Sequence, residues 1–325
     1  FSNFRQSRKL GLQQAALATS CSKKSIFIQR VQDKHSYKRL TILQKLKHFS
    51  ELVMLSHTVF SLPFILIAMV VASHGIPSVG TLLLGIAAAF FARNFAMTVN
   101  RYADREYDAK NPRTASRPSV DGRMSPSLQM FFIASNGAMF VAVSYLINDL
   151  AFVLSFAFLP ILAGYSYFKR FSSAAHLVLG LSLGLAPIAG EIAVNASVSL
   201  WSLCLAGGVL FWVAGFDVFY ALQDMEFDKS EGLHSIPSIF GEKKALDIAA
   251  LFHVGTVVFW YLFVKFANLE FLSFVGVFLA ALLLGYEHAL VRKDRGAIGK
   301  AFFNINGYLG ILFLILVVID VGIDI

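Results

Sequence analysis

Two short stretches of the 325-residue sequence combine acids and bases at a spacing that suits metal chemistry. The first reads NRYADREYDAKNPRTASRP, and in it Asn100, Asp104 and Asp108 recur every four residues. The second reads QDMEFDKSEG, and in it Asp224 and Asp228 repeat the same spacing. Residues four apart lie on one face of a helix, so each stretch is expected to align its side-chain oxygens.

Such a concentration of negative charge requires a compensating cation. Like charges one turn apart destabilise a helix by roughly 0.2–0.5 kcal/mol. Because Mg²⁺ keeps several waters and completes its octahedral coordination with phosphate oxygens, two carboxylate pairs predict Mg²⁺ that faces a diphosphate. The expected metal ligands are Asn100, Asp104, Asp108, Asp224 and Asp228, and the four aspartates are the expected catalytic residues. The bases expected to bind the diphosphate are Arg93, Lys110, Arg113, Arg117 and Lys229.

A simpler explanation exists for either pair alone. A solvated helix end can carry charge pairs such as Asp104 with Arg105, which set topology and do no chemistry. Two pairs on different segments weaken this explanation, because the segments are separated by four predicted helices and therefore have the same orientation. We interpret the doubled arrangement as a catalytic metal site.

The elements that must position these residues are membrane helices. The sequence is 57% apolar and only 15% charged, whereas soluble domains average about 25% charged residues. A bilayer core needs about 20 mostly apolar residues per helix, and by that measure the sequence predicts nine spans. Gly180 and Gly184 form a GxxxG pattern, which favours close helix packing over chemistry. The predicted spans are residues 51–74, 78–99, 127–147, 150–168, 174–194, 200–223, 245–266, 269–290 and 300–322.

The distribution of basic residues predicts the topology. The N-terminal arm and the loops after the even-numbered spans hold 26 of the 28 Lys and Arg residues. Since basic loops face the cytoplasm, the N-terminus and both aspartate stretches are expected there, with the C-terminus opposite. The net charge of +8 then reflects topology and anionic lipid and requires no nucleic-acid partner. We expect residues 1–45 to form a basic arm or a targeting remnant and 46–325 to form one membrane domain.

Two charged residues lie inside predicted spans, where polar side chains are costly and are functional candidates. Arg93 lies about two turns before Asn100, and Asp217 lies about two turns before Asp224. Both are therefore expected below the mouth of one cavity. The alternative is a structural ion pair between the two helices.

The sequence resembles the UbiA superfamily of intramembrane aromatic prenyltransferases, especially the 4-hydroxybenzoate polyprenyltransferases. The resemblance runs from about Leu46 to the C-terminus and rests on NRYADREYD, NPRTASRP, YSYFKRF, YALQDMEFD and EGLHSIPSIFG. It implies an all-α integral membrane protein, with nine transmembrane helices in a UbiA-type bundle around a central lipid-accessible cavity. It also implies Mg²⁺ between the aspartates and a prenyl diphosphate, since the asparagine and the four aspartates match the family's metal-site pattern.

The resemblance also implies where the acceptor binds. Lys169 and Arg170 fall in the loop that benzoate-type relatives associate with the acceptor carboxylate, and Asp217 and Tyr220 are expected beside it. For Arg170 we favour carboxylate binding, because a guanidinium can donate two parallel hydrogen bonds. For Lys169 an ordinary positive-inside anchor is the better explanation. Both cations are expected to lie apart from the diphosphate cluster.

The sequence departs from the family pattern at two positions. Arg101 follows Asn100 where many members have Asp, and SVDG follows Pro118 where relatives have LP, a small residue and Gly. The second departure concerns the loop over the site and leaves the metal ligands unchanged.

The function that follows is Mg²⁺-dependent transfer of a polyprenyl group from polyprenyl diphosphate to an aromatic acid, first of all 4-hydroxybenzoate, in respiratory quinone biosynthesis. The alternatives are a dihydroxynaphthoate-type menaquinone precursor or another UbiA-type acceptor, a hydrolase of prenyl diphosphates, and, most remotely, a secondary transporter. A transporter site would lie near the bilayer midplane, whereas these carboxylates are expected at one interface. We expect a multi-pass protein that lies in a bacterial inner membrane or in the inner membrane of an organelle.

Overall fold

The computed structural model describes residues 41–53 and 62–323, and these residues form helices and loops without a strand. The chain divides into two units, Phe1–Lys47 and His48–Ile325, of which the second contains the helical bundle. Most of the predicted arm, residues 1–40, lies outside the described residues. Its extent to residue 45 stays a prediction.

The described helices include eight that are long and apolar enough to cross a membrane. This confirms a multi-pass membrane protein and the all-α class. Between them lie short α-helical, 3₁₀ and π segments. The elements are α2 (Ile42–Val53), α3 (Leu62–Ala72), α4 (Val79–Lys110), α5 (Pro126–Ile147), α6 (Asp149–Phe168), α7 (Ala175–Asn195), α8 (Leu200–Ala221), η2 (Leu222–Asp224), α9 (Met225–Ser230), α10 (Ile236–Phe240), α11 (Glu242–Phe266), α12 (Phe271–Lys293), η3 (Arg295–Ala297), α13 (Ile298–Lys300), η4 (Ala301–Ile305) and α14 (Asn306–Ile323).

The first predicted span, residues 51–74, differs from the other eight. Residues 51–53 end α2, residues 54–61 lie outside the described residues, and the rest contains the 11-residue α3, which is about 16 Å long. Nevertheless α3 belongs to the bundle. Phe64 is fully buried, and its ring centroid lies 5.0 Å from that of Trp212 in α8 and 5.3 Å from that of Trp260 in α11.

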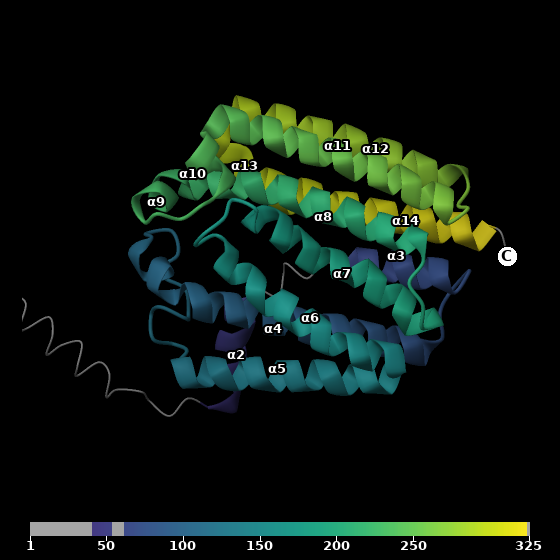
Figure 1. The fold of residues 1–325 in the computed structure, drawn as a ribbon, viewed down its shortest axis with the longest axis horizontal. Helices are drawn as coiled ribbons and strands as arrows, with labels where there is room; N and C mark the ends of the chain where they lie inside the picture. Colours follow the sequence, from purple (N-terminus) through teal and green to yellow (C-terminus); the bar gives the residue numbers. More distant parts are fainter. Residues whose placement is uncertain (1–40, 54–61, 324–325) are drawn as a thin grey trace, which may run out of the picture. The chain divides into compact units, whose positions relative to one another are not determined.

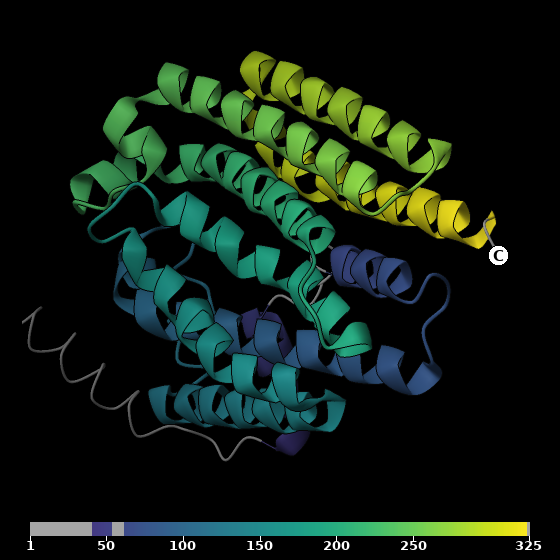
Figure 2. The ribbon, with the colours of Figure 1, turned by 45° about the vertical axis from the view of Figure 1, so that its right-hand side comes forward.

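The bundle brings the basic loops to one end. In Figures 1 and 2, α11 and α12 lie side by side along one edge, α8 and α14 lie next to them, and α4, α5 and α6 form the opposite edge. The connections that follow α4, α6, α8 and α12 all lie at the left of Figure 1. The two aspartate stretches therefore share one end of the bundle, as their predicted orientation requires.

The predicted GxxxG seam is confirmed between α7 and α8. A Cβ added to Gly180 would lie 2.2 Å from the carbonyl oxygen of Leu210, and one added to Gly184 would lie 2.9 Å from that of Ala206. Only glycine allows the two backbones to approach this closely. Because α7 and α8 both line the site described below, the seam also sets its width.

A single methyl group at this seam is expected to destabilise the protein. Gly180→Ala should cost about 1–3 kcal/mol, because the new Cβ meets backbone that must move. Gly164→Ala in α6 is the matched control, since nothing lies within 4 Å of its added Cβ. Thermal unfolding of the two purified variants in detergent checks this. Equal unfolding temperatures would contradict a packing role for the seam.

Candidate active site

The first aspartate stretch continues a membrane helix beyond its apolar span, as the spacing of its side chains predicts. The predicted span stops at residue 99, but α4 continues to Lys110, after which Asn111 caps it by donating its amide N–H to the Tyr107 carbonyl. The next residue, Pro112, lacks the backbone N–H that a continuing helix needs. Asp104 and Asp108 are buried and lie on one face of this helix, as their spacing predicts.

The second stretch does not continue its helix in the same way. α8 ends at Ala221, the chain tightens into the 3₁₀ turn η2, and α9 begins after Asp224. Asp224 therefore closes one element and Asp228 lies in the next, where a single regular helix was expected. Asp224 and Asp228 nevertheless line one cavity.

A polar cavity of about 280 Å³ brings the two stretches together. All five predicted metal ligands line it, and so do several of the predicted substrate-binding residues. The predicted residues in its lining are Asn100, Asp104, Asp108, Arg113, Arg117, Lys169, Asp217, Tyr220, Asp224 and Asp228. Two segments more than 100 residues apart in the chain thus form one site.

Each of three aspartates faces a basic partner across this cavity. Nζ of Lys169 lies 3.1 Å from Oδ2 of Asp104, and Nη1 of Arg117 lies 2.7 Å from Oδ1 of Asp108. Asp224 accepts two hydrogen bonds from one guanidinium, that of Arg113. Lys169 is therefore part of the aspartate cluster, although we expected it to lie apart.

Arg113 is held in place by more than Asp224. Its Nη1 donates to the Tyr220 hydroxyl at 2.8 Å, and its guanidinium lies over the Tyr220 ring with 5.0 Å to the centroid. Burial alone would lower the pKa of Arg113, but hydrogen bonds with Asp224 and the tyrosine outweigh burial and raise it. A permanently charged, oriented guanidinium suits phosphate oxygens.

The carboxylates fit a hard divalent cation. Oδ1 of Asp104 and Oδ2 of Asp108 are buried and have no hydrogen-bond partner, and buried anionic oxygens of this kind are ligands that Mg²⁺ prefers. The side-chain N–H of Asn100 donates to Oδ2 of Asp104 at 3.1 Å, and Oδ1 of Asn100 accepts a hydrogen bond from Arg101. In the described part of the chain no three acids, histidines or cysteines lie close enough to hold one ion. Mg²⁺ is commonly bound by one or two carboxylates, with water and phosphate oxygens as its other ligands.

Four predicted substrate-binding cations lie outside the lining of this cavity. One of them, Arg93, was expected at the diphosphate and instead lines the apolar cavity described below. Lys110 pairs with Glu231 at 2.5 Å, and Lys229 pairs with Glu226 at 3.1 Å. Arg170 donates to the Ala103 carbonyl at 2.8 Å and lies 3.9 Å from the Asp104 carboxylate. Their contacts with substrate stay predictions, but Arg170 belongs to the aspartate side of the site and does not lie apart from it.

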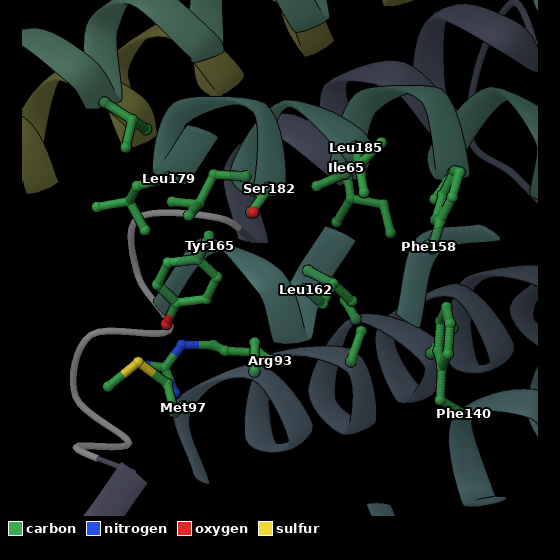
Figure 3. A pocket seen from close by; sticks show the side chains of 18 of the residues that line it. Ile65, Arg93, Met97, Phe140, Phe158, Leu162, Tyr165, Leu179, Ser182 and Leu185 are labelled. Atoms are coloured by element: carbon green, nitrogen blue, oxygen red, sulfur yellow. The ribbon is translucent and has the colours of Figure 1, made fainter. Parts of the chain in front are cut away.

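An apolar cavity of about 210 Å³ adjoins the polar one (Figure 3). The two share Met97, Tyr165, Leu179 and Asp217 in their linings. Arg93 lies in the apolar cavity, where Figure 3 shows its guanidinium and the Tyr165 hydroxyl on the same side of the pocket. Arg93 also donates to the Val53 carbonyl at 3.2 Å. A third, smaller cavity shares five lining residues with the apolar one and prolongs it: Ile65, Ala88, Phe140, Phe158 and Ala189.

Sequence reasoning missed several residues of the site, among them Asn111, whose side-chain N–H donates to Asp224 at 2.9 Å, and a histidine. His176, in the first turn of α7, lines the polar cavity, and its Nδ1 lies 2.7 Å from Oδ2 of Asp217. This pairing takes the place of the ion pair that we considered between Asp217 and Arg93. A lone histidine after a run of small residues carries no recognisable signal, so the sequence could not identify it.

Known proteins resemble this chain over most of its length. The UbiA prenyltransferase family model matches residues 61–314. The 4-hydroxybenzoate octaprenyltransferase of Tolumonas auensis is 32% identical over 75% of this chain and 85% of its own length. The enzyme of the same name from Aeromonas hydrophila is 32% identical over 78% of this chain and 88% of its own length.

Solved structures show the same fold. The apo structure of a UbiA homologue from Aeropyrum pernix K1 has a TM-score of 0.74 and 31% identity, covering 81% of this chain and 98% of its own. A UbiA homologue from Archaeoglobus fulgidus bound to GPP and Mg²⁺ has a TM-score of 0.65 and 22% identity, and the match covers 83% of this chain and 99% of the homologue.

Proposed function

This chain belongs to the UbiA prenyltransferase family, and from that premise we propose that it transfers a polyprenyl group from polyprenyl diphosphate to an aromatic acid, in the first place 4-hydroxybenzoate. One observation carries the proposal. A polar cavity with two aspartate pairs opens into an apolar cavity through shared residues. A polyprenyl diphosphate has the same two parts, a charged diphosphate head that suits the polar cavity and a hydrocarbon chain that suits the apolar one. The acceptor is taken from the names of the relatives.

The diphosphate end of the proposed substrate lies at the aspartates. Asp104, Asp108, Asp224 and Asp228 would hold Mg²⁺, which when bound neutralises the diphosphate and makes it a better leaving group. Lys169, Arg113 and Arg117 now pair with three of these carboxylates. When metal and substrate bind, the same cations are free to turn from carboxylate to phosphate oxygens, and charge stays balanced in both states.

The acceptor carboxylate is assigned to Arg93 in preference to Arg170. Arg170 is committed to the Ala103 carbonyl and lies outside the lining of both cavities. Arg93 instead lines the apolar cavity beside Asp217, about 10 Å along α4 from Asn100. Arg93 donates to the Val53 carbonyl, and a small aromatic carboxylate in this cavity would be a further acceptor for the guanidinium, able to take two parallel hydrogen bonds.

The apolar cavity would take the prenyl chain and exclude water. Its lining is mainly aliphatic and aromatic, with the small residues Ala88, Ala89, Ala92 and Ala96 along one side of α4. A dry environment is needed because water would capture an allylic carbocation before the ring reacts.

An acceptor panel tests the proposal. Purified protein is given labelled polyprenyl diphosphate and Mg²⁺ with 4-hydroxybenzoate, dihydroxynaphthoate, homogentisate or no acceptor. The expected result is prenylated 4-hydroxybenzoate as the main product. Prenylation of dihydroxynaphthoate or homogentisate instead would change the acceptor, and release of phosphate without any acceptor would favour a hydrolase. An assay in which no diphosphate is consumed would contradict the proposed function.

A further inference from the structure

Three groups form a hydrogen-bonded chain from the backbone of α10 to the cavities. The amide N–H of Ile236 donates to Nε2 of His176 at 3.1 Å, and Nδ1 of His176 lies 2.7 Å from Oδ2 of Asp217. A ring nitrogen that accepts a hydrogen bond carries no proton. His176 is therefore neutral, and the proton on Nδ1 is donated to Asp217. Its side chain is only 4% exposed, so surrounding groups hold the ring in this orientation.

Asp217 lies where the two cavities meet. It lines both of them, and its side chain is 25% exposed. With an acceptor carboxylate at Arg93 and the diphosphate at the aspartate pairs, the reacting ring carbon lies at this junction. Oδ2 is hydrogen-bonded to His176, and the residue is part of the lining of both cavities.

Other acids of the site have different partners. Asp104, Asp108 and Asp224 each pair with a cation, and together with Asp228 they form the pairs assigned to Mg²⁺. Among the described residues that line the apolar cavity, Asp217 is the only acid. It stands about two turns before Asp224 on α8, outside both pairs.

From this geometry we propose that Asp217, oriented by His176, takes the proton that the aromatic ring loses. The inference rests on the proposed function. The C1–O bond of the prenyl diphosphate breaks first, with its electron pair leaving on the diphosphate, and C1 then forms a bond to a ring carbon ortho to the hydroxyl. That ring carbon then bears both the chain and its original hydrogen. Asp217 removes the hydrogen as a proton, and the electron pair of the C–H bond restores the aromatic ring. The products are prenylated acceptor, diphosphate and one proton, which leaves through the polar cavity.

The test uses 4-hydroxybenzoate deuterated at both ring carbons ortho to the hydroxyl. In wild type, diphosphate departure is expected to limit turnover, so the deuterium effect on kcat should be close to one. Asp217→Asn keeps the shape and the hydrogen-bond acceptor but is a far weaker base. Its turnover should fall by roughly 10²-fold, as is typical when a general base is lost, and a primary deuterium effect should appear because ring deprotonation becomes slow. The KM for prenyl diphosphate should stay unchanged.

A matched pair at His176 separates positioning from folding. Glutamine keeps an N–H donor for Asp217. Leucine is similar in size but has no hydrogen-bond donor in its side chain. His176→Gln is expected to retain most activity without a deuterium effect, and His176→Leu should be slower and show one. If Asp217→Asn has no measurable turnover, this pair decides the question. A merely structural role would lower the rate of either variant without changing its isotope effect.

The outcomes distinguish this step from the proposed function. Wild type that does not prenylate 4-hydroxybenzoate overturns the proposed acceptor and this step with it. Wild-type turnover combined with an unchanged deuterium effect in Asp217→Asn overturns Asp217 alone and assigns the proton to another base, such as the departing diphosphate. Equal deuterium effects in the two His176 variants overturn the positioning role of the histidine.

Discussion

Asp104→Asn is expected to lower prenyl transfer by roughly 10³-fold, the upper end of what one removed charge-stabilising group costs. Asparagine preserves the size of the side chain but removes the negative charge that binds Mg²⁺. It also replaces one of the two carboxylate oxygens with an NH2 group, which donates hydrogen bonds and cannot bind a cation. Lys169 loses its carboxylate partner at the same time. The diphosphate must then bind at a site that has one negative charge fewer. Initial rates with saturating substrates, at several Mg²⁺ concentrations, measure the loss.

The appropriate control is an aspartate away from the site. Asp149 is exposed in the first turn of α6, at the end of that helix away from Lys169, and Asp149→Asn should retain wild-type activity. Asp224→Asn should resemble Asp104→Asn, because the second pair faces the same cavity. Excess EDTA should abolish activity in wild type, and Mg²⁺ should restore it. Near-normal turnover of either site variant, or full activity in EDTA, would be incompatible with the metal assignment.

Arg93→Ala is expected to weaken acceptor binding selectively. A lost charge-assisted hydrogen bond costs about 1.5–3 kcal/mol, which corresponds to roughly tenfold to a hundredfold in affinity. The effect should appear in KM and kcat/KM for 4-hydroxybenzoate, with little change in KM for prenyl diphosphate, because Arg93 lines the apolar cavity and is absent from the lining of the polar one. An acceptor without the carboxylate provides the sharpest control. Wild type and variant should use phenol equally poorly if the arginine acts through that group.

Arg170→Ala distinguishes the two candidate arginines. Arg170 contacts the Ala103 carbonyl and lies near Asp104, so its loss should affect protein stability and KM for prenyl diphosphate more than KM for the acceptor. An acceptor-selective defect in Arg170→Ala, together with unchanged acceptor kinetics in Arg93→Ala, would reverse the assignment. A defect confined to prenyl diphosphate in Arg93→Ala would place that arginine at the diphosphate.

Most of the helical architecture could be predicted from the sequence, for a local physical reason. Runs of about 20 apolar residues form helices in a bilayer because a membrane-spanning backbone must satisfy its hydrogen bonds internally. The end of α8 was harder to predict, because the sequence YALQDMEFD contains no Pro or Gly that would mark the 3₁₀ turn η2. The hydropathy pattern of α4 ends about three turns before the helix does, but the spacing of Asn100, Asp104 and Asp108 predicts that the helix continues through them, as it does.

Spacing along the chain was enough to identify the two aspartate pairs. Asp104 and Asp108 share a face of α4, as residues four apart on a helix do, and Asp224 and Asp228 line the same cavity although they belong to η2 and α9. Spacing was also enough to place both pairs at one end of the bundle. The pairing of acids with bases could not be read from spacing, because it depends on how each helix is rotated and how closely it packs against its neighbours. Contacts such as the α7–α8 glycine seam set that rotation and distance. They bring Lys169 to Asp104, leave Arg170 outside both cavities, and join His176 to Asp217 across 41 residues of sequence.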